Sequence, residues 1–158
     1  MAGLDISILL GWDKIAHFSM YAFFAFFIGF LLLLVTSKTT STPALLYLWF
    51  LLSLIGIIEE YRQYFVLDRS AEFLDAIANV LGITAGLFVP FMIAHILSRK
   101  IKQPIKVHLV FMLTTLILTP LLVGLLYINE NPFIYLPDEK RMIVEDTLAI
   151  KHVFKPFQ

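Results

Sequence analysis

Apolar residues gather in four long stretches of this chain, separated by short polar connections. The first stretch runs from Ile15 to Val35, and apart from tyrosine its only ionisable residue is His17. A helix needs about 20 mostly apolar residues to cross roughly 30 Å of hydrocarbon, so this stretch predicts a membrane-spanning helix. The polar run 36–42 ends it, and Pro43 suits the first turn of a second helix.

The second stretch is interrupted by acidic residues. Its apolar part, 44–58, is too short to span a bilayer before Glu59 and Glu60 follow. Either this segment is not transmembrane, or the helix continues through both acids to about Phe65; with four spans, we expect the second. The carboxylates then lie near the membrane boundary and should face protein rather than lipid, because an unpaired charge in hydrocarbon is costly.

Two further helices are predicted after this point. One runs from about Ala71 to Leu97, with Ser70 as its N-cap. The other covers Val107–Ile128, with a kink at Pro120. The sequence therefore predicts an all-α polytopic membrane protein with about four transmembrane helices in one bundle, residues 1–128. A polar tail without assigned structure, 129–158, completes the chain.

Composition agrees with this prediction and excludes several other classes of protein. The chain has 158 residues, of which 59% are hydrophobic and 15% charged. A water-soluble domain of this size has too little interior to conceal so many apolar residues. The absence of cysteine excludes disulfide frameworks, thiolate nucleophiles and Cys-ligated zinc. Twelve basic and twelve acidic residues give no support for nucleic-acid binding, and the sequence predicts no cofactor.

The basic residues of the connections predict how the protein is oriented. With four crossings, the connections 36–42 and 98–106 lie on the same side of the membrane, and neither contains an acid. Their basic residues are Lys38, Arg99, Lys100, Lys102 and Lys106. Short loops rich in Lys and Arg stay in the cytoplasm. Both termini and the acidic turn between the second and third helices are therefore expected outside the cytoplasm.

Polar residues of the first two helices recur at helical spacing near that outward side. Asp13, His17 and Tyr21 stand at i, i+4 and i+8, which places them along one face of the first helix. Glu60 and Gln63 share a face of the second helix at i, i+3. Both faces lie at the same level of the membrane and are expected to meet.

The third helix adds an acid, an amide and two small residues to the same arrangement. Asp75 and Asn79 are one turn apart, and Gly82 and Gly86 continue the stripe. A Gly-x-x-x-Gly spacing lets a neighbouring helix approach closely. Polar groups from three crossings therefore converge at one membrane face, where we expect a single site.

Three strings of these residues resemble a known family. They are Asp13-Lys14-x-x-His17-Phe18-x-x-Tyr21, Glu60-x-x-Gln63-x-Phe65-x-x-x-Arg69-Ser70 and Asp75-x-x-x-Asn79-x-x-Gly82-x-x-x-Gly86. In this order and spacing the chain is similar to the VanZ-like family of bacterial membrane proteins. The resemblance implies a role in the bacterial cell envelope, at the plasma membrane, and lowered susceptibility to glycopeptides of the teicoplanin type. It supplies no defined reaction.

Recognition of an amphiphile is the function that we favour from the sequence. In this interpretation an envelope lipid or a lipoglycopeptide lies at the outward face, among the membrane lipids. Arg69, with Lys14 or Arg62, holds its phosphate or carboxylate, assisted by the amino end of the third helix near Ser70. The side chains expected to orient its hydroxyl, sugar and amide groups are Asp13, Glu60, Gln63 and Asn79.

Two other functions stay open. In a metal-dependent enzyme, Asp13, Glu60 and Asp75 would hold a divalent cation. His17 would then act as general base and Arg69 would contact the phosphoryl group of a lipid-linked phosphate or pyrophosphate. In a small transporter, His17 and the carboxylates would relay protons or ions.

A purely structural interpretation competes with all three functions. Charged residues at helix ends commonly mark the membrane boundary, and Lys14, Arg62 and Glu72 are expected to be solvated or to snorkel toward water. His95 and His108 are expected to be ordinary interfacial residues near the basic connection. The oligomeric state is left open.

Overall fold

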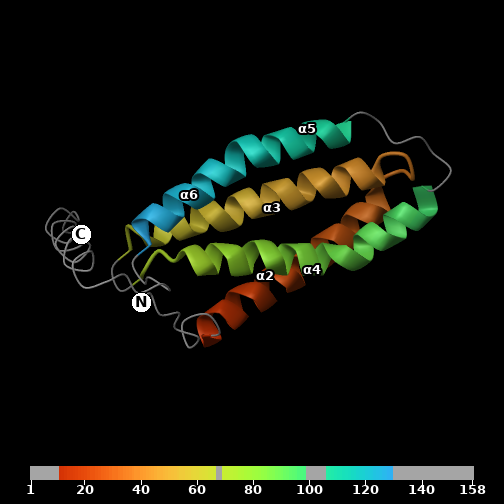
Figure 1. Ribbon diagram of the computed structural model, residues 1–158. Helices are drawn as coiled ribbons and strands as arrows, with labels where there is room; N and C mark the ends of the chain where they lie inside the picture. Colours follow the sequence, from red (N-terminus) through yellow and green to blue (C-terminus); the bar gives the residue numbers. More distant parts are fainter. Residues whose placement is uncertain (1–10, 67–68, 99–105, 130–158) are drawn as a thin grey trace, which may run out of the picture.

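Four helical rods make up the part of the chain that the structure, a computed structural model, describes: residues 11–66, 69–98 and 106–129 (Figure 1). Helix α2 spans Trp12–Val35, α3 spans Ser41–Gln63 and α4 spans Phe73–Ser98. The fourth rod consists of α5 (Lys106–Leu113), the π-helical turn η1 (Thr114–Leu118) and α6 (Thr119–Ile128). These ranges contain no strand, so the predicted all-α fold is confirmed.

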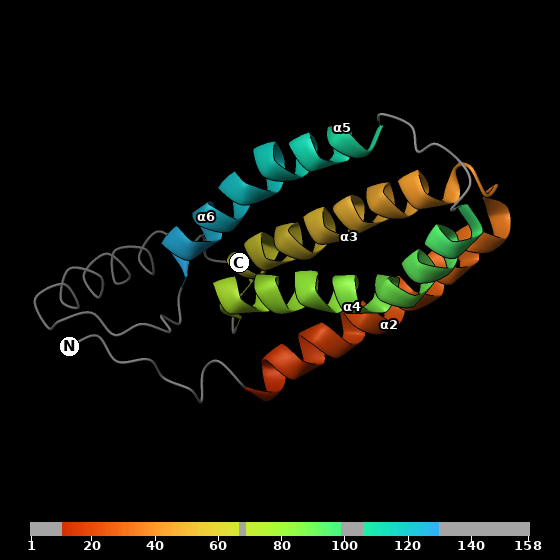
Figure 2. The same cartoon turned by 45° about the vertical axis from the view of Figure 1, so that its right-hand side comes forward.

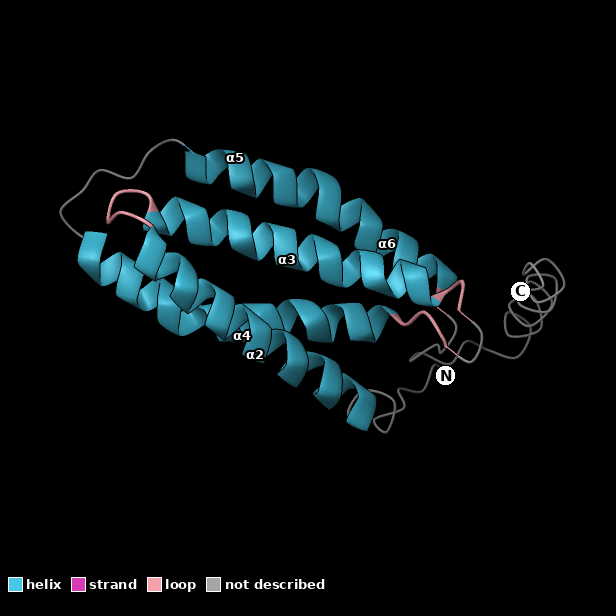
Figure 3. Ribbon diagram, turned by 180° about the vertical axis from the view of Figure 1, so that it is seen from behind, coloured by secondary structure: helices cyan, strands magenta, loops and turns pink. Residues whose placement is uncertain are grey.

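Successive rods run in opposite directions and lie side by side in one bundle (Figures 1 and 2). Helix α4 lies between α2 and α3, and the fourth rod packs on the other side of α3. One end of the bundle therefore collects the helix ends at Trp12, Gln63, Phe73 and Ile128 (Figure 3). We call this end the polar rim, and the opposite end, which holds residues 36–40, the loop end.

Large apolar side chains cover the outside of the bundle. On α2, for example, Phe23 is 58% exposed and Phe24 is 54% exposed. Such a surface is unfavourable in water but suits contact with lipid. The 24 residues of α2 extend about 36 Å, and α2, α3 and α4 are each long and apolar enough to cross a bilayer. The chain is an integral membrane protein with α-helical spans.

Exposed aromatic residues at the polar rim are typical of a membrane boundary. Trp12 at the start of α2 is 87% exposed, and Tyr127 near the end of α6 is 90% exposed. Trp and Tyr favour the interface between hydrocarbon and water because their rings are amphipathic. His17 lies five residues further along α2, so it is only about 7 Å deeper than Trp12.

Two glycines set the distance between α4 and α2. A Cβ atom at Gly82 would collide with the backbone carbonyl of Phe18, and one at Gly86 would collide with that of Ala22. The two backbones touch at these points, which only glycine allows. The contact also holds His17, the neighbour of Phe18, against the first turns of α4.

The second helix continues through its acids, as predicted. Helix α3 ends at Gln63, and Glu60 is fully buried against protein. Glu59 lies on a different side of α3, is partly exposed, and accepts a 2.8 Å hydrogen bond from Arg62 Nε. Of the two carboxylates, Glu60 is therefore the one that faces the interior of the bundle.

The start of the third helix differs from the prediction. Helix α4 begins at Phe73 rather than at Ala71. The carbonyl of Glu72 accepts the first backbone hydrogen bonds, from Asp75 N at 3.2 Å and Ala76 N at 3.3 Å. The prediction that Ser70 is the N-cap is therefore wrong, and Ser70 Oγ instead donates to Glu72 Oε1 at 3.1 Å.

The fourth rod covers the predicted range, with its irregularity just before Pro120. Proline has no N–H to donate to the carbonyl of Leu116, and the helix widens into the π turn η1 there. The tail 130–158 and the basic residues of the predicted 98–106 connection that fall within 99–105 lie outside the described residues. The proposed domain boundary after residue 128 therefore stays a prediction.

Candidate functional site

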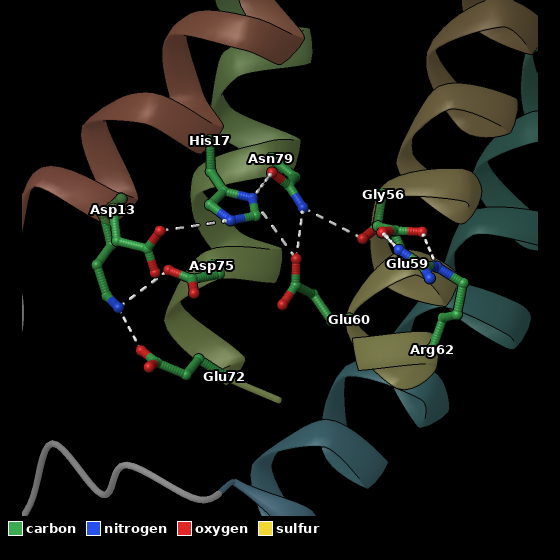
Figure 4. Close-up of polar contacts among 10 residues, drawn as sticks. Asp13, His17, Gly56, Glu59, Glu60, Arg62, Glu72, Asp75 and Asn79 are labelled. Atoms are coloured by element: carbon green, nitrogen blue, oxygen red, sulfur yellow. Dashed lines mark hydrogen bonds and ion pairs between the residues drawn. The ribbon is translucent and has the colours of Figure 1, made fainter. Parts of the chain in front are cut away.

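A cluster of polar side chains joins α2, α3 and α4 at the polar rim (Figure 4). Its members come from the start of α2, the last turns of α3 and the start of α4. We call it the rim cluster, and it consists of Asp13, Lys14, His17, Gly56, Glu60, Glu72, Asp75 and Asn79. Residues from each of the three sequence strings described above therefore lie close together.

Asn79 is the centre of the cluster and touches all three helices. Its Nδ2 donates to the carbonyl of Gly56 at 3.2 Å and to Glu60 Oε1 at 3.1 Å. Its Oδ1 lies 3.0 Å from His17 Nδ1. A backbone carbonyl only accepts hydrogen bonds, so the amide nitrogen must face α3 and the amide oxygen must face α2.

His17 links this amide to the acid at the start of α2. Because Asn79 Oδ1 is an acceptor, Nδ1 of the ring carries the proton and donates to it. The same Nδ1 lies 3.6 Å from Glu60 Oε1. The opposite ring nitrogen, Nε2, lies 3.8 Å from Asp13 Oδ1. In the neutral ring, Nε2 therefore presents its lone pair on the side of Asp13.

Lys14 lies inside the bundle rather than at its surface. Its Nζ pairs with Glu72 Oε2 and lies 3.0 Å from Asp75 Oδ1. The side chains of Lys14 and Glu72 are only 12% and 9% exposed, so the expectation that they are solvated or snorkelling is wrong. The crossing of α2 over α4 explains this, because it places Lys14 opposite the start of α4. Arg62, by contrast, has a 64% exposed side chain, as expected.

The rim cluster contains more acid than base. Its carboxylates belong to Asp13, Glu60, Glu72 and Asp75, and its fixed positive charge to Lys14. Glu60 is fully buried, and no hydrogen-bond partner for its Oε2 lies within the described residues. A buried acceptor left without a partner costs about 1–3 kcal/mol. This excess favours ligands that donate hydrogen bonds or carry positive charge.

The other predicted residues lie around the cluster in different ways. Tyr21 lies one helical turn after His17 on α2, and its ring is close to Gly56. Gln63 is buried at the end of α3. Ser70 reaches the cluster through its hydrogen bond to Glu72. Arg69 is exposed at the polar rim, and within the described ranges no hydrogen bond or ion pair joins it to the cluster. Glu72 and Asp75 occupy Lys14, and Glu59 pairs with Arg62. The predicted anion clamp of Arg69 with Lys14 or Arg62 therefore stays a prediction.

One group of side chains has the spacing of a metal site. Asp13, His17 and Asp75 each offer a ligand atom, and these atoms lie within 4.8 Å of one another. Glu60, which the sequence placed among the possible cation ligands, is not one of this group. It supports Asn79 instead.

Two members of the cluster were not predicted from the sequence. Gly56 supplies its carbonyl to Asn79, and a Cβ there would lie 3.1 Å from the Cβ of Asn79 and 3.4 Å from the ring of Tyr21. Its position one turn before Glu60 is the signal that could have found it. Glu72 lies three residues before Asp75, on the same side of the chain. That spacing could have marked the two acids as partners for one base.

Two apolar grooves of the bundle lie away from the rim cluster. One lies between α3 and α4 toward the loop end, where it is lined by Leu45, Trp49, Leu87 and Phe91 among others. A shallower one follows the π turn of the fourth rod, beside Leu116 and Pro120. The cluster is accessible at the polar rim, where the Asp13 side chain is 53% exposed.

Comparison with protein-family models, with curated proteins and with solved structures gives no match to this chain. The chemistry of the rim cluster is therefore the evidence for function.

Proposed function

We propose that this chain is a VanZ-like protein of the bacterial plasma membrane, and that its rim cluster recognises the polar headgroup of an envelope lipid or of a lipoglycopeptide. Binding would sequester the amphiphile at the outer interface and lower susceptibility to teicoplanin-type glycopeptides. The three strings that suggest the family contribute residues to one cluster, which supports the proposal that they form a single site.

The observation that carries the proposal is the buried, partly unsatisfied acid at an interface. Glu60 Oε2 has an unused lone pair among the described residues, although the rest of its surroundings is arranged by Asn79 and His17. A buried acid with an unsatisfied oxygen lowers the stability of a membrane bundle, so a gain in stability does not explain its presence. A headgroup hydroxyl, amide or amine would satisfy the free acceptor.

The exposed cation at the rim supports an amphiphile that also carries an anion. Arg69 stands at the membrane boundary, where it is free of the carboxylates that occupy Lys14. A guanidinium binds phosphate or carboxylate through paired hydrogen bonds. Hydrogen-bond donors of the ligand would thus face Glu60, and its anionic group would face Arg69.

The charges at the loop end support an outward position for the rim. Lys38 lies exposed in that end, and α5 begins there with Lys106. Both belong to the connections whose excess of Lys and Arg predicts a cytoplasmic location. The polar rim would then face the envelope, where lipid-linked precursors and glycopeptides meet the membrane.

Teicoplanin binding to the full-length protein in lipid nanodiscs tests the proposal. We expect Glu60→Gln and Arg69→Ala each to weaken binding at least about tenfold, which corresponds to about 1.4 kcal/mol. Glu59→Gln, on the same helix turn but outside the cluster, should leave binding unchanged. Circular dichroism of each variant controls for folding.

Two results would contradict recognition of this kind. Binding that is absent from the wild-type protein for both teicoplanin and an undecaprenyl-linked precursor would remove its basis. Release of phosphate from a polyprenyl pyrophosphate, abolished by Glu60→Gln, would instead indicate the metal-dependent enzyme.

A further inference from the structure

We propose that Asp13, His17 and Asp75 form a binding site for a divalent transition-metal ion of the zinc class at the polar rim. Asp13 and His17 stand one turn apart on α2, and Asp75 faces them from α4. Their ligand atoms lie within 4.8 Å of one another. Metal binding goes beyond the recognition of a headgroup and does not depend on it.

Small side-chain movements would complete the coordination geometry. With Zn–N and Zn–O distances of about 2.0–2.2 Å, tetrahedral ligand atoms lie about 3.3 Å apart. His17 Nε2 and Asp13 Oδ1 are already 3.8 Å apart. The Asp13 side chain is 53% exposed and can turn toward the metal at little cost in packing. Bonds to a metal therefore require the three ligand atoms to move closer together, and the exposed Asp13 side chain is the one free to make most of that movement.

The rim cluster holds His17 in the form that a metal needs. Asn79 is oriented by its donated hydrogen bonds to Gly56 and Glu60, so its oxygen accepts from His17 Nδ1. The lone pair of the imidazole is then on Nε2, which faces Asp13. Histidine ligands of metals characteristically donate their other ring N–H to a fixed acceptor in this way. Asn79 therefore holds His17 as a hydrogen-bond partner outside the coordination shell holds a metal ligand.

A cation would also offset charge that the described residues leave unbalanced. The Glu60 carboxylate points from α3 toward α2 and α4 (Figure 4), it is fully buried, and its Oε2 lacks a partner in the described ranges. Lys14 is shared between Glu72 and Asp75, so it balances only part of the negative charge. A dication beside Asp75 would offset two of the three negative charges that Lys14 leaves when all four carboxylates are ionised, without displacing Lys14 from Glu72.

The ligand atoms select the kind of metal. One imidazole nitrogen and two carboxylate oxygens suit Zn²⁺, whereas Mg²⁺ and Ca²⁺ favour oxygen ligands throughout. Three protein ligands leave a fourth position open at the exposed side of the rim. Tighter binding of Zn²⁺ than of Mg²⁺ is therefore expected.

Zinc titration of the full-length protein, without a polyhistidine tag and in detergent micelles, tests the site. We expect one Zn²⁺ per chain in competition with a chelating dye. Since loss of an outer-shell partner already weakens metal binding 10- to 100-fold, Asp13→Asn and His17→Ala should each weaken it at least about tenfold. His95→Ala and Glu59→Gln, which change a similar group outside the site, should have no effect.

The titration gives a clear result even where some variants fold poorly. Asp13 is half exposed, so Asp13→Asn should fold even if variants of buried residues do not. No zinc binding by the wild-type protein, or binding that survives both Asp13→Asn and His17→Ala, would overturn the proposal. The titration contains neither teicoplanin nor envelope lipid, so its failure leaves headgroup recognition standing, and failure of teicoplanin binding leaves the metal site standing.

Discussion

Polar side chains lie at both ends of the bundle, but they make different kinds of contact. At the loop end, Ser37 Oγ bonds to the hydroxyl groups of Thr39 and Thr40 at 2.9 Å, and Thr36 Oγ1 donates to the Leu32 carbonyl four residues earlier. At the polar rim, the contact of His17 with Asn79 joins residues 62 positions apart. These loop-end contacts are local, whereas the contacts of His17 and Lys14 at the polar rim link different helices.

This difference separates two roles of polar residues in a membrane protein. A hydroxyl group that bonds within its own turn forms its contact as soon as the chain turns, and water reaches it afterwards. The rim contacts form only when three helices have assembled, and they are shielded from water. Changes at the rim should therefore reduce the stability of the bundle, while equivalent changes at the loop end should not.

The largest contrast is expected between two lysines. Lys14→Met leaves Glu72 and Asp75 buried without their counter-charge, and loss of one partner of a buried pair typically lowers the free energy of unfolding by about 3–5 kcal/mol. The same substitution at the exposed Lys38 should have little effect. Reversible unfolding by SDS in mixed micelles measures both. Equal losses at the two positions would refute the distinction between the ends.

A smaller loss is expected when the amide at the centre of the rim cluster is removed. Asn79→Leu leaves the Gly56 carbonyl and Glu60 Oε1 without their shared donor, so the free energy of unfolding should fall by about 1–3 kcal/mol. Thr84→Val on the same helix removes the acceptor of one bond from Trp49 and the donor of a local bond to the Val80 carbonyl, and should cost about 0.6 kcal/mol. The same SDS titration compares them, and a smaller loss for Asn79→Leu would contradict the central role of this residue.

The smallest effect is expected at the loop end itself. Ser37→Ala removes hydroxyl contacts that are exposed and local, so the free energy of unfolding should change by no more than about 0.5 kcal/mol. A loss above about 1 kcal/mol in that titration would show that the loop end also stabilises the assembled bundle.

The sequence was sufficient to predict the rods but not all of their ends. Apolar length alone predicted the first helix and the continuation of α3 through Glu59 and Glu60. It misplaced the start of α4, because Glu72 rather than Ser70 is the residue whose carbonyl accepts the first backbone hydrogen bonds of the helix. Hydropathy contains little information about such local backbone geometry.

The same limit applies to the rim cluster. Helical spacing correctly grouped His17, Glu60 and Asn79 at one level, because residues at i, i+3 and i+4 share a face. It misjudged Lys14 and Glu72, since burial of a charge at a helix start depends on how α2 crosses α4. That crossing depends on contacts at Gly82 and Gly86 whose geometry appears only in three dimensions.

The π turn η1 keeps the buried apolar residues of the fourth rod on one side of the helix. Val110 and Leu118 are both buried, although a regular α-helix would separate positions eight residues apart by about 80° around its axis. In the wider π turn between them, the rotation per residue about the helix axis is smaller, which removes most of this angular offset. Leu125, seven positions after Leu118, then continues the same line. The rod thus keeps one continuous surface against α3, and shortening it by one residue within η1 would restore a regular helix without turning that surface away.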